Sequence, residues 1–195
     1  FLPFFILILG AAFLVRIVSV KQPKAPRLVW GSTPIINFSR WSRAMEAYGY
    51  KSETFVIDYF SSINRREDWD IILSERYPLV PSPFKKYIAF VDALFKYDIF
   101  FMSFDGFFLS NSYFSFFQSY FLKVAQKKTV IIPYGGDAFD YSRIRSVQLQ
   151  HGLMMSYPKA SKQQSVISKR LNYWIKNSDV LIPGMMGPDG FGRWD

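Results

Sequence analysis

The chain contains no cysteine and only one histidine, His151, among its 195 residues. Without cysteine it cannot form disulfides, thiolate zinc sites, iron–sulfur clusters or a thiol nucleophile, and this composition is compatible with a reducing compartment. A single histidine also excludes a His-rich metal site and a relay of several histidines. His151 itself could act as a general base, and an ordinary hydrogen-bonded role is the alternative.

Three sequence signatures of nucleotide-binding and hydrolytic enzymes are missing as well. The chain has no G-x-G-x-x-G, no G-x-x-x-x-G-K-[ST] and no G-x-S-x-G, which leaves a dinucleotide oxidoreductase, a P-loop nucleotidase and a serine hydrolase unsupported. The net charge is +9, but the longest basic runs are pairs such as Lys85-Lys86 and Lys127-Lys128. Nucleic acid is therefore not a predicted partner.

Apolar and aromatic side chains are abundant, with 21 Phe and 12 Tyr, and they begin at the amino terminus. Residues 1–15 carry no charge and are followed by four basic residues: Arg16, Lys21, Lys24 and Arg27. This pattern predicts a hydrophobic membrane-anchor helix over residues 1–20 and a stiff Pro-containing linker over residues 21–26. The positive-inside tendency predicts a single pass through an inner or plasma membrane, with a cytoplasmic body. A secretory signal peptide and a buried helix are the alternatives.

After residue 27, apolar β-type runs alternate with helical patterns. Strands are predicted near residues 28–31, 54–57, 98–104, 129–133 and 179–182, with a further short strand at 71–73. Helices are predicted at residues 36–48, 83–95, 111–126 and 161–176. The alternation predicts an α/β fold, a Rossmann-like parallel sheet with helices on both faces, over residues 27–195. The aromatic helix 111–126 should be mainly core, or else present one face to lipid or another domain.

Three of the predicted strands end in small or acidic residues: Gly31-Ser32-Thr33, Asp105-Gly106 and Gly135-Gly136-Asp137. The carboxyl ends of parallel strands are where ligands bind in open α/β sheets, so we predict that these loops share a ligand cleft. Adjacent glycines allow the backbone to approach a ligand closely, although a plain tight turn is the alternative. Asp137 would orient a substrate hydroxyl or cap the following helix.

Asp68-Trp69-Asp70 has the Asp-x-Asp pattern with which many sugar transferases hold a divalent cation. Such a motif works when it ends a buried strand, whereas here it precedes the apolar run 71–73. We therefore predict a solvated loop or helix cap, and no metal site.

Four features together resemble the amino-terminal domain of GT-B fold glycosyltransferases, in particular the family 4-like group. The first is the helix end Arg43-Ala44-Met45-Glu46-Ala47-Tyr48-Gly49-Tyr50, and the second is the strand 98–104 that runs into Asp105-Gly106. The third is Ile132-Pro133-Tyr134-Gly135-Gly136-Asp137, which is similar to a characteristic strand end of the family. The fourth is the helix 161–176 followed by Asn177-Ser178-Asp179-Val180-Leu181-Ile182. The resemblance covers residues 27–195.

This resemblance implies the acceptor-binding half of a membrane-associated glycosyltransferase, which transfers a sugar from a nucleotide-sugar donor to a glycan or glycolipid acceptor. Asp137 and His151 are the catalytic candidates. The candidate acceptor-binding residues are Gly31, Ser32, Thr33, Asp105, Gly106, Gly135 and Gly136. The implied partners are a glycan or lipid-linked acceptor, the membrane and a carboxyl-terminal domain.

The nucleotide sugar would bind to that second domain, which carries the Glu-x7-Glu-type element of the family, so no cofactor is expected on this chain. The chain begins with Phe1 and stops at Asp195, before such a domain, and we expect a fragment that transfers little sugar alone. The alternative is a non-catalytic Rossmann-like binding or interaction module on a membrane anchor.

Overall fold

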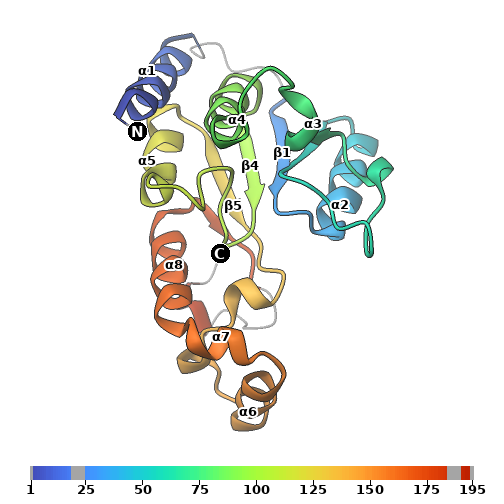
Figure 1. The fold of residues 1–195 in the computed structure, drawn as a ribbon, viewed down its shortest axis with the longest axis vertical. Coiled ribbons are helices and arrows are strands. Elements are labelled where there is room, and N and C mark those ends of the chain that lie inside the picture. Colours follow the sequence, from blue (N-terminus) through green and yellow to red (C-terminus); the bar gives the residue numbers. More distant parts are fainter. Residues whose placement is uncertain (1, 19–24, 184–189, 194–195) are drawn as a thin grey trace. The chain divides into compact units, whose positions relative to one another are not determined.

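The computed structural model describes residues 2–18, 25–183 and 190–193. Contacts divide the chain into two compact units (Figure 1). The first unit comprises residues 1–102 and 106–129, and the second comprises residues 103–105 and 130–195. Part of the predicted anchor and most of the predicted linker, residues 19–24, lie outside the described residues.

The strands form one six-stranded parallel sheet in the order β3-β2-β1-β4-β5-β6. Their bounds are β1 Arg27–Ser32, β2 Lys51–Val56, β3 Ile71–Ile72, β4 Ile99–Met102, β5 Lys128–Ile131 and β6 Val180–Leu181. The order reverses between β1 and β4, as in Rossmann-like folds, and β1 pairs in parallel with both β2 and β4. The predicted α/β class and the parallel sheet flanked by helices are confirmed.

The helices of the first unit cover its strands and one another. They are α1 Leu2–Val18, α2 Ile36–Ala47, α3 Leu73–Arg76, α4 Ser82–Lys96 and α5 Gln118–Val124, with the short 3-10 helices η1 Arg66–Asp68 and η2 Ser115–Phe117. Helix α2 packs on β1 and β2. The core is strongly aromatic: the rings of Phe100 and Phe107 lie 5.2 Å apart, and those of Phe55 and Phe108 lie 4.5 Å apart.

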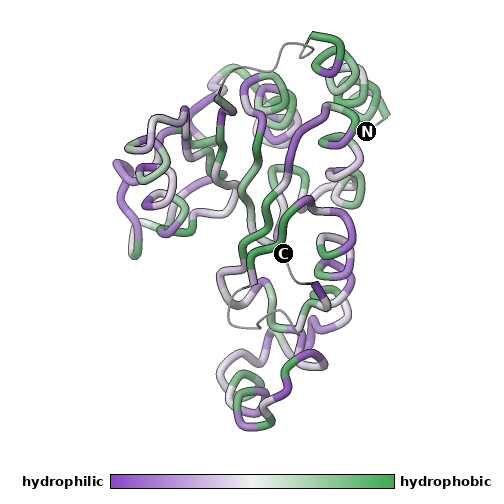
Figure 2. The backbone as a smooth tube through the Cα atoms, turned by 180° about the vertical axis from the view of Figure 1, so that it is seen from behind, coloured by the Kyte–Doolittle hydropathy of each residue, from purple (hydrophilic) through white to green (hydrophobic). Residues whose placement is uncertain are grey.

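The amino-terminal helix α1, one of the most apolar segments in Figure 2, packs against α4 and α5. Its buried stripe consists of Ile8, Ala11, Ala12 and Val15. Phe4 stacks on Tyr87 of α4 at 4.7 Å, and Phe5 meets Phe121 of α5 at 5.3 Å. Of the helices in the described part of the chain, none combines the length and the apolar character that a membrane span requires.

The aromatic segment 111–126 is not one helix, contrary to the prediction. Only residues 115–117 and 118–124 are helical, and residues 107–114 form turns. Serine side chains explain the difference, because they bond to the local backbone in place of a helical ladder. Ser112 Oγ donates to Leu109 O at 2.7 Å and accepts from Phe114 N. Hydrophobic periodicity does not show that serine hydroxyls compete with helical hydrogen bonds for the backbone, so it predicted one continuous helix.

The Asp-x-Asp segment forms a cap and a strand tie, as expected of a structural motif. Asp68 Oδ2 accepts the backbone N–H of Arg65 at 2.7 Å and caps η1. Asp70 Oδ2 accepts both the N–H and the hydroxyl of Thr54 and so fastens β3 beside β2. Trp69 between them is buried against Val56 and Ile72.

A charged triad joins the start of β4 to β1 and to the segment before β5. Asp98 accepts from Arg27 Nε at 3.1 Å and from Lys127 Nζ at 3.3 Å. The Lys127 side chain is only 3% exposed, so its ammonium depends on this carboxylate. Burial lowers the pKa of Lys127, and Asp98 opposes that effect.

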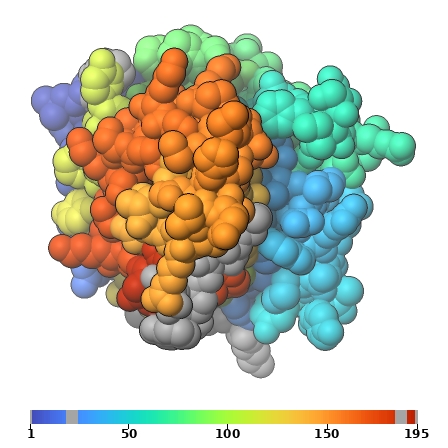
Figure 3. Space-filling view, turned by 90° about the horizontal axis from the view of Figure 1, so that it is seen from below, coloured from blue at the N-terminus to red at the C-terminus, as the bar shows by residue number. Residues whose placement is uncertain are grey.

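The second unit continues from β5 through short helices to β6. Its helices are η3 Gly136–Ala138, η4 Tyr141–Arg143, α6 Val147–Ser156, α7 Pro158–Lys162 and α8 Gln164–Asn177. The side chains of α6 and α7 crowd the near face of this unit (orange in Figure 3). A small core of Phe139, Tyr141 and Leu153 lies beneath them. The helix predicted at 161–176 begins later, at Gln164, because residues up to 162 belong to α7, which Pro158 starts.

Candidate functional site

The turn that follows β5 is held by the side chain of Asp137. One carboxylate oxygen accepts the backbone N–H groups of Tyr134 and Gly135, each at 3.0 Å, and the other accepts the N–H of Phe104 at 3.1 Å. Gly135 has φ +135°, a conformation that only glycine adopts readily. Asp137 therefore fixes the glycine turn and joins it to the segment that follows β4.

Asp137 is unusual in being a carboxylate only 1% exposed. Burial raises its pKa to about 6, helped by the neighbouring charge of Asp105 and opposed by the three backbone N–H bonds. A raised pKa at a strand end is a recognised mark of a functional site, although buried structural carboxylates show it as well. Because both oxygens are engaged by the backbone, Asp137 is placed to position the turn.

Asp105 and Arg170 form an ion pair beside this turn. Arg170 Nη1 contacts Asp105 Oδ1, and Arg170 Nη2 donates to the backbone oxygen of Asp137 at 3.0 Å. Tyr134 Oη donates to the other oxygen of Asp105 at 2.9 Å, and burial and this carboxylate raise the pKa of Tyr134. Among the described residues, Arg170 Nε is one of three buried side-chain polar atoms without a hydrogen-bond partner.

A cavity of about 480 Å³ opens next to these groups, entirely within the second unit. Its lining comes from the segment after β4, from the β5 turn and from residues 156–170, and it includes Asp105, Tyr134, Gly136, Asp137, Tyr157, Lys159, Gln163 and Arg170. This volume matches a small ligand such as one or two sugar rings. Asp105 and Asp137 line the cavity as well, and Arg170 pairs with Asp105, so Lys159 is the lining cation outside this ion pair. With Gln163 and the two tyrosines, Lys159 suits a ligand that combines hydroxyl groups with a negative charge.

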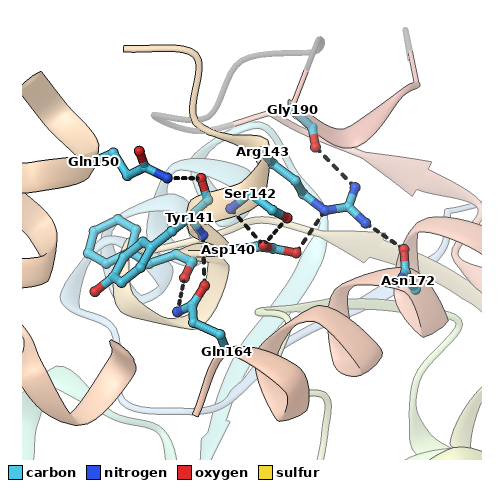
Figure 4. Close-up of polar contacts among 9 residues, drawn as sticks. Asp140, Tyr141, Ser142, Arg143, Gln150, Gln164, Asn172 and Gly190 are labelled. Carbon is cyan, nitrogen blue, oxygen red and sulfur yellow. Dashed lines mark hydrogen bonds and ion pairs between the residues drawn. The ribbon is translucent and has the colours of Figure 1, made fainter. Parts of the chain in front are cut away.

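The segment after the glycine turn is pinned by a network of polar contacts (Figure 4). Gln164, at the start of α8, accepts from Tyr141 N at 2.7 Å and donates to Phe139 O at 2.8 Å. Asp140 accepts from Arg143 Nε at 3.0 Å, and Arg143 also donates to Asn172. These bonds fix α8, and hence Arg170, relative to the turn that carries Asp137.

The structure brings together four of the residues predicted from the sequence. Asp105, Gly136 and Asp137 line the cavity, and Gly135 lies in the same turn. His151, in contrast, is exposed on α6 and is not among the cavity-lining residues. Its predicted catalytic role stays a prediction without geometric support.

The other predicted residues, Gly31, Ser32, Thr33 and Gly106, belong to the first unit. Gly31 has a structural reason to be glycine, since a β-carbon there would lie 2.0 Å from Phe55 O. Ser32 is 1% exposed, and its backbone oxygen accepts Ile57 N at 2.9 Å. Gly106 is buried with φ +82°. That these residues share a cleft with Asp105 and Asp137 stays a prediction.

Three important cavity residues were missed from the sequence: Tyr157, Lys159 and Arg170. An arginine in an amphipathic helix ordinarily indicates solvent. Arg170, however, lies three residues after the buried Ile167 and four before the buried Trp174, and this spacing, which puts it beside the buried stripe of α8, was the available signal.

Among the described residues, no group of three or more histidines, aspartates or glutamates is arranged to hold a metal ion. Comparisons of the chain with protein-family models, with curated proteins and with solved structures found no match. The function is therefore inferred from the fold and from the cavity of the second unit.

Proposed function

We propose that this chain is the acceptor-binding half of a membrane-associated glycosyltransferase. In this proposal the second unit holds the glycan or glycolipid acceptor, and a nucleotide sugar supplies the transferred sugar from a separate domain. The parallel sheet with the order β3-β2-β1-β4-β5-β6 supports a ligand-binding α/β domain.

The observation that carries the proposal is the lining of the 480 Å³ cavity. Tyr134 and Tyr157 offer ring faces and hydroxyl groups, and both are about half exposed, at 48% and 52%. Gln163 and Lys159 offer hydrogen-bond donors for ring hydroxyls or for a charged substituent. A concave site that mixes aromatic faces with a few polar groups is the usual form of a small-molecule site.

A second candidate is a binding module without catalysis, and one observation favours it. Asp137, the buried acid of the site, has both carboxylate oxygens occupied by backbone N–H groups. Asp105 is likewise engaged by Arg170 and Tyr134. His151 is not a cavity-lining residue. The described part of the second unit thus offers the cavity no carboxylate without a partner, which suits recognition better than proton transfer.

The proposal is tested by measuring the binding of sugars to the chain with saturation-transfer NMR and calorimetry. A panel should pair each neutral oligosaccharide with a phosphorylated or uronic-acid counterpart. We expect the anionic members to bind more tightly. Lys159→Gln should weaken their binding by roughly fivefold, since one exposed charged contact is worth about 1 kcal/mol.

Lys162→Gln is the matched control, because Lys162 is exposed on the same helix α7 and is not a cavity-lining residue. Equal effects of the two substitutions, or no binding of any sugar, would contradict the proposal. Transfer is then assayed with the full-length protein, labelled nucleotide sugars and the acceptor that binds. Binding without transfer to that acceptor would support the second candidate.

A further inference from the structure

Apart from Arg16, helix α1 is apolar on all sides, yet the described part of the chain buries only one of them. Its buried residues are spaced three and four apart, at Ile8, Ala11, Ala12 and Val15, which defines a single stripe along the helix. The remaining sides expose Leu2 at 70%, Ile17 at 69% and Val18 at 69%. The large exposed side chains are Leu2, Ile6, Leu7, Phe13, Leu14, Ile17 and Val18.

The exposed apolar surface extends from α1 to α5. Phe5 contacts Phe117 edge-to-face at 5.4 Å, and Phe117 is itself 45% exposed. Tyr120, on the next turn, is 49% exposed. We call these exposed side chains of α1, η2 and α5 the apolar face. An exposed apolar surface of this kind on a folded unit marks an interaction site.

The charges on these elements are all of one sign. Residues 2–18 and 106–124 include no aspartate and no glutamate. They carry Arg16 and Lys123, and both side chains are exposed. Two copies of this face would place like charges together, which disfavours a dimer. Apolar and aromatic side chains accompanied only by cations fit the interface of an anionic bilayer.

We propose that the apolar face docks the first unit onto an anionic lipid surface, with α1 lying along the interface. This inference makes specific, and rests on, the membrane association in the proposed function. It also differs from the single-pass anchor expected from the sequence. Helix α1 packs against α4 and α5, with ring contacts at Phe4 and Phe5 and a buried stripe that continues to Val15. A helix docked over that length offers lipid its opposite side only.

The first experiment is flotation of the chain with lipid vesicles, in the absence of any sugar. Vesicles of phosphatidylcholine alone are compared with vesicles that contain about 30% phosphatidylglycerol, the anionic component that basic residues recognise. We expect binding to the anionic vesicles and weakening by salt. Arg16→Gln and Lys123→Gln should each reduce the affinity about fivefold, the effect of roughly 1 kcal/mol for each basic residue.

The apolar contribution is tested with Leu14→Gln and Ile17→Gln, which should each cost on the order of tenfold in affinity. Val147→Gln and Met155→Gln are the matched controls, because these residues are 71% and 73% exposed on α6 of the second unit. All four variants should keep the parental melting temperature. Equal binding by both pairs, or no vesicle binding, would overturn the proposal. So would a dimer in solution that Leu14→Gln dissociates.

The orientation of α1 can be read directly, since the chain has no cysteine to interfere with labelling. A fluorophore that dithionite reduces is attached to Leu2→Cys or to Val18→Cys, at the two ends of α1. If α1 lies along the interface, external dithionite quenches both labels on sealed vesicles. Protection of one label and exposure of the other would show a spanning helix and refute the proposal. Because no sugar is present, neither outcome bears on the cavity of the second unit.

Discussion

The buried carboxylate of Asp137 should make the protein less stable as the pH rises from about 4 to about 7. Its pKa is about 6 in the folded protein against an ordinary value of 3.8. Between these values the folded protein binds more protons than the unfolded chain, so the stability falls with rising pH. The contribution is complete below the lower pKa and lost above the upper one. The pKa difference corresponds to about 3 kcal/mol.

Asp137→Asn isolates this effect, because asparagine does not titrate. Its side-chain oxygen can still accept the N–H groups of Tyr134 and Gly135, whereas its amide nitrogen would face the N–H of Phe104. That lost bond should cost about 1–3 kcal/mol at every pH. The variant should therefore be the less stable protein near pH 4, and near pH 7 it should equal or exceed the parent.

The free energy of unfolding of both proteins is measured in urea at several pH values, with circular dichroism and tryptophan fluorescence as the probes of unfolding. The carboxylates of Glu53, Asp98 and Asp140 have lowered pKa values, so their stabilisation is lost as the pH falls through those values. They are present in both proteins and cancel in the difference. Asp105, Arg170 and Tyr134, which face Asp137, are also unchanged. A difference in unfolding free energy that does not vary with pH would refute the reasoning.

Three further predictions concern single contacts. Gly135→Ala should destabilise the protein by about 1–3 kcal/mol because of the positive φ, while Gly136→Ala, which meets nothing within 4 Å, should change the unfolding free energy by less than about 0.5 kcal/mol; equal melting temperatures would contradict this. Asp98→Ala should cost about 3–5 kcal/mol by leaving the buried Lys127 unpaired, and replacing Lys127 by Met in the same variant should recover much of it in urea unfolding. Gln164→Leu should remove the bonds to Tyr141 N and Phe139 O and cost about 2–4 kcal/mol; an unchanged urea midpoint would argue against the importance of these bonds.

The alternation of apolar runs and helical patterns was enough to predict the sheet. Strands such as 28–31 and 129–133 were recognisable because buried parallel strands read as continuous apolar segments. The helix over 111–126 was wrong because serine hydroxyls engage the backbone there, an effect that hydrophobic periodicity does not contain.

Only those site residues that stand in a recognisable local motif could be predicted from the sequence. Gly135, Gly136 and Asp137 stand out as a glycine turn after β5, and Asp105 follows the adjacent strand β4. Arg170 on α8 and Tyr157 between α6 and α7 lie farther along the chain, and only tertiary packing brings them to that turn. His151 drew attention as the only histidine, but rarity carries no information about position.

The hydrogen bond from Tyr141 N to the Gln164 side chain allows the local stability of the second unit to be measured by hydrogen exchange. Gln164 and Arg170 lie on the same helix α8, one bonded to the 139–141 segment and the other to Asp105. The amide hydrogen of Tyr141 exchanges with solvent when its bond to the Gln164 side chain opens. Its exchange rate in deuterated water therefore reports how often the start of α8 separates from the 139–141 segment, and a ligand that engages Arg170 on the same helix should slow that exchange.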